Sequence, residues 1–173
     1  PLSAKLDIGR FTHGLGVGDV SGDGRADVLW KEGWFEQPAS LANDPEWTFH
    51  AFRFSDREGG AQMFTYDVDG DGDRDVITSL AAHHFGLSWF EHTKKDGAVD
   101  FVEHRIMDDP SAKNARGVCF SELHAIDLAD VNGDGLQDVV TGKRWWAHGA
   151  AGDPQPGSKP EVWWFELVRE KDG

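Results

Sequence analysis

Residues 67–77 read Asp67-Val68-Asp69-Gly70-Asp71-Gly72-Asp73-Arg74-Asp75-Val76-Ile77, and this stretch decides the fold. Two further copies begin at Asp19 and Asp130. Each copy has oxygen-bearing side chains at positions 1, 3, 5 and 9, a glycine at position 6, and apolar residues after position 9. A Ca²⁺ loop needs this spacing, because alternate side chains converge on one point, position 7 offers its carbonyl, and glycine permits the sharp turn. The sequence therefore predicts three calcium loops.

The composition is that of a folded, acidic protein. Of the 173 residues, 39% are hydrophobic, with eight Trp and eleven Phe, which favours a packed core over disorder. The net charge of −14 argues against nucleic acid as a partner. Cys119 is the only cysteine, so no disulfide can form within the chain. The sequence has no apolar run long enough to span a membrane and no visible signal peptide.

Short apolar runs flank each loop and predict strands. The loops begin 48 and 63 residues apart, close to the period of β-propeller blades. The runs before them are 15–17, 63–66 and 124–128, and the runs after them are 28–30, 76–78 and 139–141. A Trp-Phe-Glu triplet then recurs at 34–36, 89–91 and 164–166. An aromatic residue with His at +3 and an apolar residue at +5 recurs as Trp47/His50/Phe52 and Phe101/His104/Ile106.

These four elements predict an all-β protein made of three four-stranded antiparallel propeller blades, at about 9–54, 59–108 and 117–173. Each Asp-rich loop is the turn between the first two strands of a blade. The third unit has no fourth strand before Gly173. Residues 1–8 could supply a strand, at 4–8, to a neighbouring or closing blade. Three blades are too few for a closed ring, so we expect the other blades in a longer protein or in a homo-oligomer.

The loop pattern Asp-x-[Asp/Asn/Ser]-Gly-Asp-Gly-x-x-Asp resembles the FG-GAP/VCBS repeats of β-propellers, to which the calcium loops of integrin α-subunits are related. The resemblance implies a propeller with Ca²⁺ in these turns and a location that is extracellular or periplasmic. It implies no single activity. The implied side-chain ligands are Asp19, Ser21, Asp23, Asp27, Asp67, Asp69, Asp71, Asp75, Asp130, Asn132, Asp134 and Asp138, with the carbonyls of Arg25, Asp73 and Leu136.

The three sites differ in expected strength. Ser21 supplies a neutral hydroxyl, so the first site should be the weakest, while the second has an acid at every odd position. An EF-hand is disfavoured, because position 12 carries Trp30, Thr78 or Thr141 instead of Glu. Mg²⁺ is an alternative that demands a tighter octahedron.

Strand alternation directs the search for activity to the edge opposite the loops. The segments that lead into the first strands there carry His13, Gln62 and His124 at equivalent positions. From loop position 9 to the Trp of the triplet the chain takes 7, 14 and 26 residues in the three units, and insertions on one face commonly carry function. The candidate ligand-binding residues are His13, Lys31, His124, Lys143, Arg144, Trp145 and Trp146. The candidate catalytic residues are His83, His84, His124, Lys143, Arg144 and His148.

Several chemistries fit these residues. Trp rings stack on sugars, and Arg pairs with carboxylates. The histidines could hold a transition metal or act as acid and base, with Glu122 as a carboxylate partner. The alternative is structural: His and Trp side chains near the inner rim fill the channel and bond to the backbone. We assign His50 and His104, which recur in register, to blade architecture.

Three functions are compatible with these residues. The first is a calcium-stabilised propeller module that binds carbohydrate or another small polar ligand. The second is part of a sugar-modifying lyase or dehydratase with a histidine-rich active site. The third is a protein-interaction scaffold of the integrin type.

Overall fold

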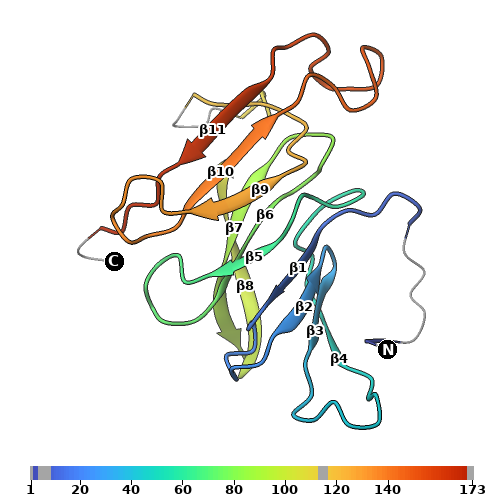
Figure 1. The fold of residues 1–173 in the computed structure, drawn as a ribbon, viewed down its shortest axis with the longest axis vertical. Helices are drawn as coiled ribbons and strands as arrows, with labels where there is room; N and C mark the ends of the chain where they lie inside the picture. Colours follow the sequence, from blue (N-terminus) through green and yellow to red (C-terminus); the bar gives the residue numbers. More distant parts are fainter. Residues whose placement is uncertain (1, 4–8, 113–116, 171–173) are drawn as a thin grey trace.

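The computed structural model describes residues 2–3, 9–112 and 117–170, which form three antiparallel sheets and no helix (Figure 1). The first sheet contains β1 (Leu15–Gly18), β2 (Asp27–Trp30), β3 (Gly33–Glu36) and β4 (Thr48–Ala51). The second contains β5 (Phe64–Tyr66), β6 (Asp75–Ser79), β7 (Leu87–Lys95) and β8 (Ala98–Met107). The third contains β9 (Ile126–Ala129), β10 (Asp138–Lys143) and β11 (Glu161–Phe165). The predicted all-β fold is confirmed.

In every sheet, strands that follow one another in the chain pair with one another, so each sheet is a meander. The predicted strand positions agree with the sheets, and the third sheet has three strands in the described part of the chain. The strand predicted at 4–8 lies outside the described residues. Between β7 and β8, Asp96 and Gly97 both have positive φ (52° and 83°), as a two-residue hairpin turn of this hand requires.

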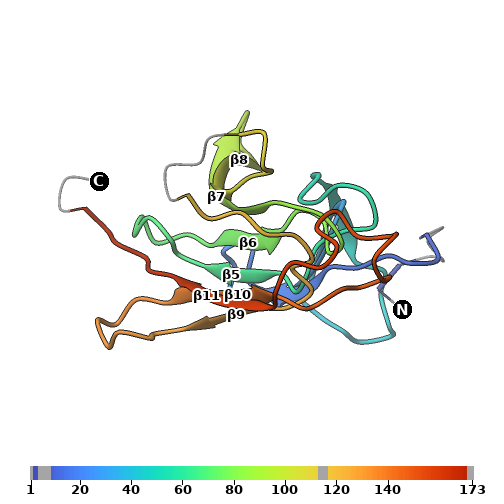
Figure 2. The ribbon, with the colours of Figure 1, turned by 90° about the horizontal axis from the view of Figure 1, so that it is seen from above.

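The second sheet is packed on both faces. All five residues of β6 are buried. Successive side chains of a strand point to opposite faces, and here Val76 joins one hydrophobic cluster while Ile77 joins another. The first cluster lies between the first and second sheets and the other between the second and third. Figure 2 shows the third sheet below β5 and β6, with β7 and β8 rising away from it.

The first strands of the first two sheets run side by side in parallel. Gly16 and Met63 form a parallel bridge, and Met63 N–H donates to the Leu15 carbonyl at 3.0 Å. A Cβ on Gly16 would lie 2.4 Å from the Met63 carbonyl oxygen, and one on Gly18 would lie 1.9 Å from Thr65 Oγ1. Only glycine permits this approach at both positions.

A Trp–His–Glu contact recurs in the first two sheets. Trp34 stacks on His50 with ring centroids 4.0 Å apart, and Trp89 stacks on His104 at 4.3 Å. The His50 ring bonds to Glu36 at 2.8 Å, and the His104 ring bonds to Glu91 at 2.6 Å. Because the contact repeats in register, it belongs to the architecture of the sheets, as expected.

The three sheets form no closed barrel or ring within the described ranges. The outer face of the third sheet is open. Trp34 is 2% exposed, whereas Trp164, at the equivalent position of the third triplet, is 43% exposed, and Val162 on the same strand is 83% exposed. No helix long and apolar enough to cross a membrane occurs in the described part of the chain.

Candidate functional site: three aspartate loops and a histidine-rich edge

The sheets place two kinds of polar group at opposite edges. The loops 19–27, 67–75 and 130–138, here called the aspartate loops, join the first two strands of each sheet and lie toward the left and lower side of Figure 1. The segments that enter β1 and β9, and those that follow β6 and β10, lie toward the right and upper side. The predicted separation of loops and connections is therefore present in these sheets.

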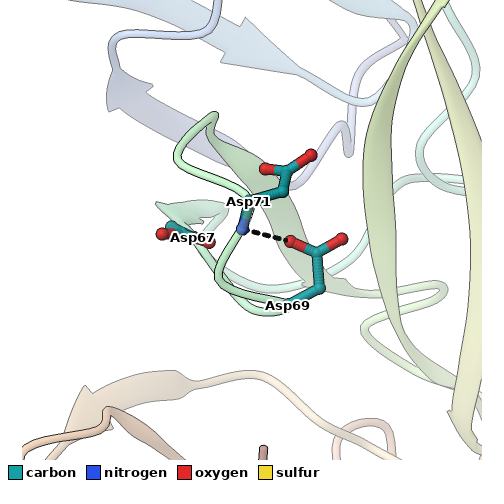
Figure 3. Close-up of side chains that lie close together, drawn as sticks. All are labelled: Asp67, Asp69 and Asp71. Atoms are coloured by element: carbon teal, nitrogen blue, oxygen red, sulfur yellow. Dashed lines mark hydrogen bonds between the residues drawn. The ribbon is translucent and has the colours of Figure 1, made fainter. Parts of the chain in front are cut away.

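The second aspartate loop brings three carboxylates together (Figure 3). Asp67, Asp69 and Asp71 each offer an oxygen within 4.8 Å of the other two, and within the described residues no other three His, Cys, Asp or Glu side chains meet this distance. Asp71 N–H donates to Asp69 Oδ1 at 3.1 Å. The other two loops have Ser21 and Asn132 at position 3. Only the second loop therefore presents three convergent carboxylates.

The carboxylate at position 1 organises the turn. Asp19 Oδ1 accepts the N–H groups of Gly22 (2.9 Å) and Asp23 (3.1 Å), and Asp19 Oδ2 accepts that of Gly24 (2.9 Å). Asp130 accepts the three equivalent bonds in the third loop. The position-6 glycines have φ between 84° and 98°, a left-handed region that favours glycine. The sharp turn predicted from the glycine is present in all three loops.

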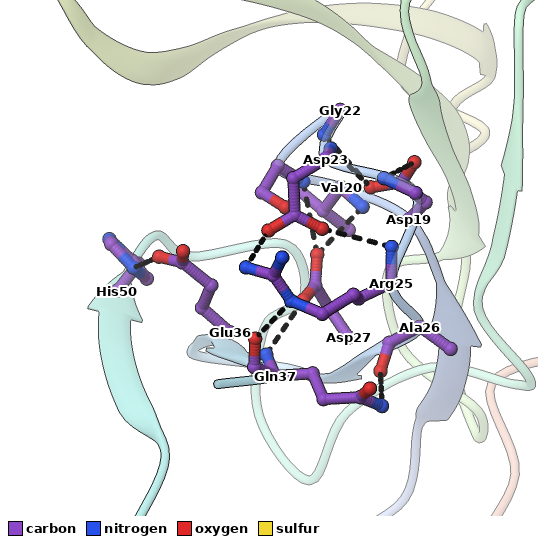
Figure 4. A network of polar contacts seen from close by, with 12 residues as sticks. Asp19, Val20, Gly22, Asp23, Arg25, Ala26, Asp27, Glu36, Gln37 and His50 are labelled. Carbon is purple, nitrogen blue, oxygen red and sulfur yellow. Dashed lines mark hydrogen bonds and ion pairs between the residues drawn. The ribbon is translucent and has the colours of Figure 1, made fainter. Parts of the chain in front are cut away.

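The position-9 aspartates have a structural role that the loop pattern did not predict. Asp27 is fully buried; its Oδ2 accepts the N–H groups of Val20 and Ser21, and its Oδ1 accepts that of Gln37 just after β3 (Figure 4). In the second loop the carboxylate of Asp75 accepts the N–H groups of Val68 (2.7 Å) and His92 (2.8 Å), and in the third that of Asp138 accepts those of Val131 and Leu167. Each joins its loop to the third strand or to the residues just after it. Burial raises the pKa of Asp75 to about 6.

Basic side chains contact the first two loops. Arg25 pairs with Asp23 in the first loop (Figure 4), and Arg169 donates from Nε to the Val68 carbonyl at 3.0 Å. No sequence pattern pointed to Arg169. Buried atoms without a hydrogen-bond partner also occur here: Ser21 Oγ and Asp73 Oδ1. A cation in the loop would supply such oxygens with a partner.

At the opposite edge four histidines from separate segments lie in one cluster. The ring of His83 lies 5.1 Å from that of His13, 4.6 Å from that of His124 and 4.3 Å from that of His148. The Nδ1 atoms of His83 and His148 are 3.2 Å apart. Arg144 Nη2 lies 3.3 Å from His124 Nε2. These five residues are called the histidine-rich edge below, and their convergence agrees with the expectation from strand alternation.

Two imidazoles of this edge, those of His83 and His124, have lowered pKa values. Burial, reinforced by His124, His148 and His13, lowers the pKa of His83 below its usual value. Burial also lowers the pKa of His124, and the Arg144 guanidinium acts in the same direction. A neutral imidazole has a free nitrogen lone pair for a proton or a metal ion.

A buried ion pair lies beneath the cluster. Lys143 Nζ contacts Glu122 Oε2, and both side chains have no solvent exposure. Ser121 Oγ also donates to Glu122 at 2.8 Å. Glu122 has a φ of 64°, uncommon for a residue with a Cβ, which marks a locally strained backbone two residues before His124. The ammonium of Lys143 is therefore paired with a buried carboxylate, which differs from the ligand-binding or catalytic position expected from the sequence.

A cavity of about 650 Å³ opens beside His124 and Arg144. Polar groups of β10 and β11, Thr141, Lys143 and Glu161, share its lining with Phe64 and Val162. Its size lies within the range of small-molecule sites. The mixture of cationic, acidic and apolar groups suits a polar ligand with both hydroxyl and anionic groups.

Some predicted residues are not part of this cluster. His84 makes no ring contact with the four histidines, and it lines a separate cavity of about 220 Å³. Lys31 Nζ bonds to Glu32 at 2.8 Å and to the Arg57 carbonyl at 3.1 Å. Trp145 and Trp146 contact each other edge to face, are 45% and 49% exposed, and do not line the larger cavity. His84, Trp145 and Trp146 are therefore outside the cluster, although they are next to His83 or Arg144 in the sequence.

No family model matches the chain, and no curated protein or solved structure matches it significantly. The residues and their geometry are therefore the basis on which a function can be assigned.

Proposed function

We propose that this chain is a calcium-stabilised β-propeller segment of the FG-GAP/VCBS type whose histidine-rich edge binds a carboxylated, polyhydroxylated ligand such as an acidic sugar. The observation that carries the proposal is the convergence of His13, His83, His124 and His148 with Arg144. Of these residues, His124 and Arg144 line the 650 Å³ cavity. These groups come from four segments that are far apart in sequence, and packing of the sheets alone does not require them to meet.

The packing of the sheets supports the propeller. The second sheet has a neighbour on each face, and β1 and β5 run parallel as the inner strands of adjacent blades do. The exposed Trp164 and Val162 leave one face of the third sheet for a further sheet. That sheet would come from the same longer protein or from a second copy. Trp164→Glu should abolish concentration-dependent association, measured by sedimentation velocity, if copies complete one another.

Oxygen chemistry supports calcium in the loops. Asp67, Asp69 and Asp71 converge, and the unpartnered oxygens of Ser21 and Asp73 lie in equivalent loops. The carboxylates of Asp67, Asp69 and Asp71 and the backbone carbonyl of Asp73 would hold the ion, because Ca²⁺ is a hard cation that prefers several oxygen ligands. Its role would be to neutralise carboxylates that otherwise repel one another.

Arg144 is the group best placed to recognise an anion. It is exposed at the cavity, and its guanidinium has further N–H donors beyond the one near His124. A carboxylate can accept two parallel bonds from it, and the hydroxyl groups of the ligand can bond to Thr141 and Glu161.

Calorimetric titration with oligouronates and with neutral oligosaccharides tests the proposal. We expect binding of the uronates, weakened at least about tenfold by Arg144→Met, because a charge-assisted pair contributes about 1.5–3 kcal/mol. Arg53→Met is the matched control, since Arg53 is exposed and lies on another part of the surface. Equal affinity in the two variants, or no binding by either class of sugar, would overturn the proposal.

A lyase or dehydratase is the second candidate, and the lowered pKa values of His83 and His124 favour it. A neutral imidazole can accept the proton α to a carboxylate or carbonyl, and Arg144 can stabilise the resulting enediolate. Loss of water or of a leaving alcohol then creates a carbon–carbon double bond. Incubation with oligouronates, followed by ultraviolet absorbance, would detect this product, and His124→Asn should abolish it.

A further inference from the structure

We propose that the four histidines of the histidine-rich edge form a site for one divalent transition-metal ion of the Zn²⁺ class, which leaves a coordination position open toward the cavity. This deepens the proposed function, on which it rests only for the role of the metal in ligand binding. The existence of the site itself stands on the geometry of His13, His83, His124 and His148.

The first two ligands already have suitable spacing. Nδ1 of His83 and Nδ1 of His148 are 3.2 Å apart. Two imidazole nitrogens in a tetrahedral zinc site, each about 2.0–2.1 Å from the metal, lie about 3.3 Å from each other. Asp153 fixes the segment that carries His148, because its carboxylate accepts the backbone N–H groups of Ala147 (2.8 Å) and His148 (3.1 Å).

His124 has the tautomer that metal ligation needs. Its Nδ1 lies 3.1 Å from the Glu122 carbonyl oxygen, which can only accept, so Nδ1 carries the proton. Nε2 therefore has a lone pair, toward which Arg144 now donates. A backbone carbonyl on one ring nitrogen and a free lone pair on the other is the usual arrangement for a metal-bound histidine.

Closing the site requires rotation of one or two rings. No three nitrogens of the cluster lie within 4.8 Å of one another, since Asp67, Asp69 and Asp71 are the one set in the described chain that meets this distance. The His83 ring is 4.6 Å from that of His124 and 5.1 Å from that of His13. A half-turn of an imidazole about its Cβ–Cγ bond exchanges nitrogen and carbon positions in nearly the same volume.

The surrounding charges suit a shared metal and an anionic ligand. Arg144 Nη2 lies 3.3 Å from His124 Nε2, so a cationic group stands next to one of the proposed ligand nitrogens. Once His124 Nε2 binds the metal, Arg144 is released from it and faces the cavity. One carboxylate oxygen of a ligand could then complete the metal site while the other pairs with Arg144.

Cobalt and zinc titrations test the site. Protein is stripped of metal, saturated with Ca²⁺ to occupy the aspartate loops, and titrated with Co²⁺ while the visible absorption of tetrahedral Co²⁺ is recorded. Calorimetry with Zn²⁺ gives the stoichiometry. We expect one equivalent, and a loss of affinity of at least about tenfold in both His83→Asn and His148→Asn.

His84→Asn is the matched control, because His84 is adjacent in sequence yet outside the cluster. It should bind as the unsubstituted protein does, and circular dichroism should show all variants folded. No bound metal, or equal affinity in His83→Asn and His84→Asn, would overturn the inference. In that case the 3.2 Å contact between His83 and His148 is a hydrogen bond between imidazoles.

The two proposals fail separately. If uronates bind equally well with and without Zn²⁺ and no metal is held, the metal site is wrong and the ligand site stands. If Zn²⁺ binds in the histidine-dependent way and no uronate binds, the metal site stands and the proposed ligand is wrong.

Discussion

The two edges of the sheets differ in how their polar groups are held. In the aspartate loops two bonds recur three times: the N–H group of loop position 2 donates to the carboxylate of position 9, and that of position 4 donates to the carboxylate of position 1. At the histidine-rich edge the contacts occur once and join distant segments, such as His83 to His148. Repetition in every unit indicates a requirement of the fold, whereas a feature present once indicates a requirement of this protein. The aspartate loops therefore define the architecture, and the histidine-rich edge is the place to seek specificity.

The largest effect should come from the buried ion pair at the histidine-rich edge. Lys143→Met leaves the carboxylate of Glu122 buried without its partner. We expect a loss of about 3–5 kcal/mol in the free energy of unfolding, measured by urea denaturation.

The double variant Glu122→Gln/Lys143→Met is the control for this pair. It removes both charges and should be closer to the unsubstituted protein than Lys143→Met alone. If the two variants are equally unstable, the pair acts by packing and not by charge compensation. The stability of this region would then depend on the packing of the two side chains and not on their charges.

Two substitutions in the first loop should have a smaller effect on the free energy of unfolding, and they distinguish the buried structural Asp27 from the candidate calcium ligand Asp23. Asp27→Ala leaves up to three backbone N–H groups without their acceptor, and should cost about 2–3 kcal/mol even in excess chelator. Asp23→Ala, which removes a partly exposed pair with Arg25, should cost less than about 1 kcal/mol in chelator.

The same two variants in the presence of Ca²⁺ test whether Asp27 acts through the ion. If Asp27→Ala were neutral in chelator and destabilising only with Ca²⁺, its carboxylate would act through the ion alone. The distinction between a buried structural aspartate and exposed ligands would then be wrong. Urea denaturation of the two variants, each with and without chelator, gives the four values needed.

The parts of this molecule that could be predicted from sequence are those encoded locally. The loop pattern placed the turns, and the flanking apolar runs placed the strands, because both depend on neighbouring residues. The placement of the histidines at one edge also followed, since antiparallel strands return to the same edge, but the pattern did not distinguish the four that meet from His84.

The remaining contacts depend on how the sheets pack. The partners of Asp27 include Gln37, which follows β3 and lies outside the loop, so the structural role of Asp27 was not visible in the loop pattern. Lys143 was expected to bind a ligand or act in catalysis, but its side chain pairs with Glu122 and has no solvent exposure. The sequence did not predict the positive φ of Glu122. The roles of Asp27 and Lys143 therefore depend on which residues the tertiary structure brings next to them, and not on residue type alone.

Removal of calcium should have a moderate effect and sharpen the difference between the loops. Chelation should lower the Tm by about 4–6 °C, or about 2 kcal/mol for a chain of this length, measured by calorimetry. Asp71→Ala should abolish more of the calcium response than Ser21→Ala, since only the second loop has three convergent carboxylates. An unchanged Tm in chelator would mean that the loops are stable without an ion, and the reverse order of the variants would contradict the ranking.

The smallest effect is the pH dependence of stability that arises at the histidine-rich edge. The pKa of His83 is lowered by burial and then by His124, His148 and His13, so the unfolded chain binds this proton more tightly than the folded one. Stability from this group is present above about pH 6.5 and is lost as the pH falls toward the pKa of the folded state. Asp75 acts in the opposite direction: with its pKa raised to about 6, its contribution is lost as the pH rises through that value.

A comparison of His83→Asn with the unsubstituted protein at each pH cancels the contribution of Asp75, so the variant should lose less stability on acidification. In His148→Asn, proton NMR should show the pKa of His83 moving back toward its usual value, because one of the charges that lowers it is gone. Identical pH profiles for His83→Asn and the unsubstituted protein would mean that the imidazoles titrate independently, and that their proximity has no electrostatic consequence.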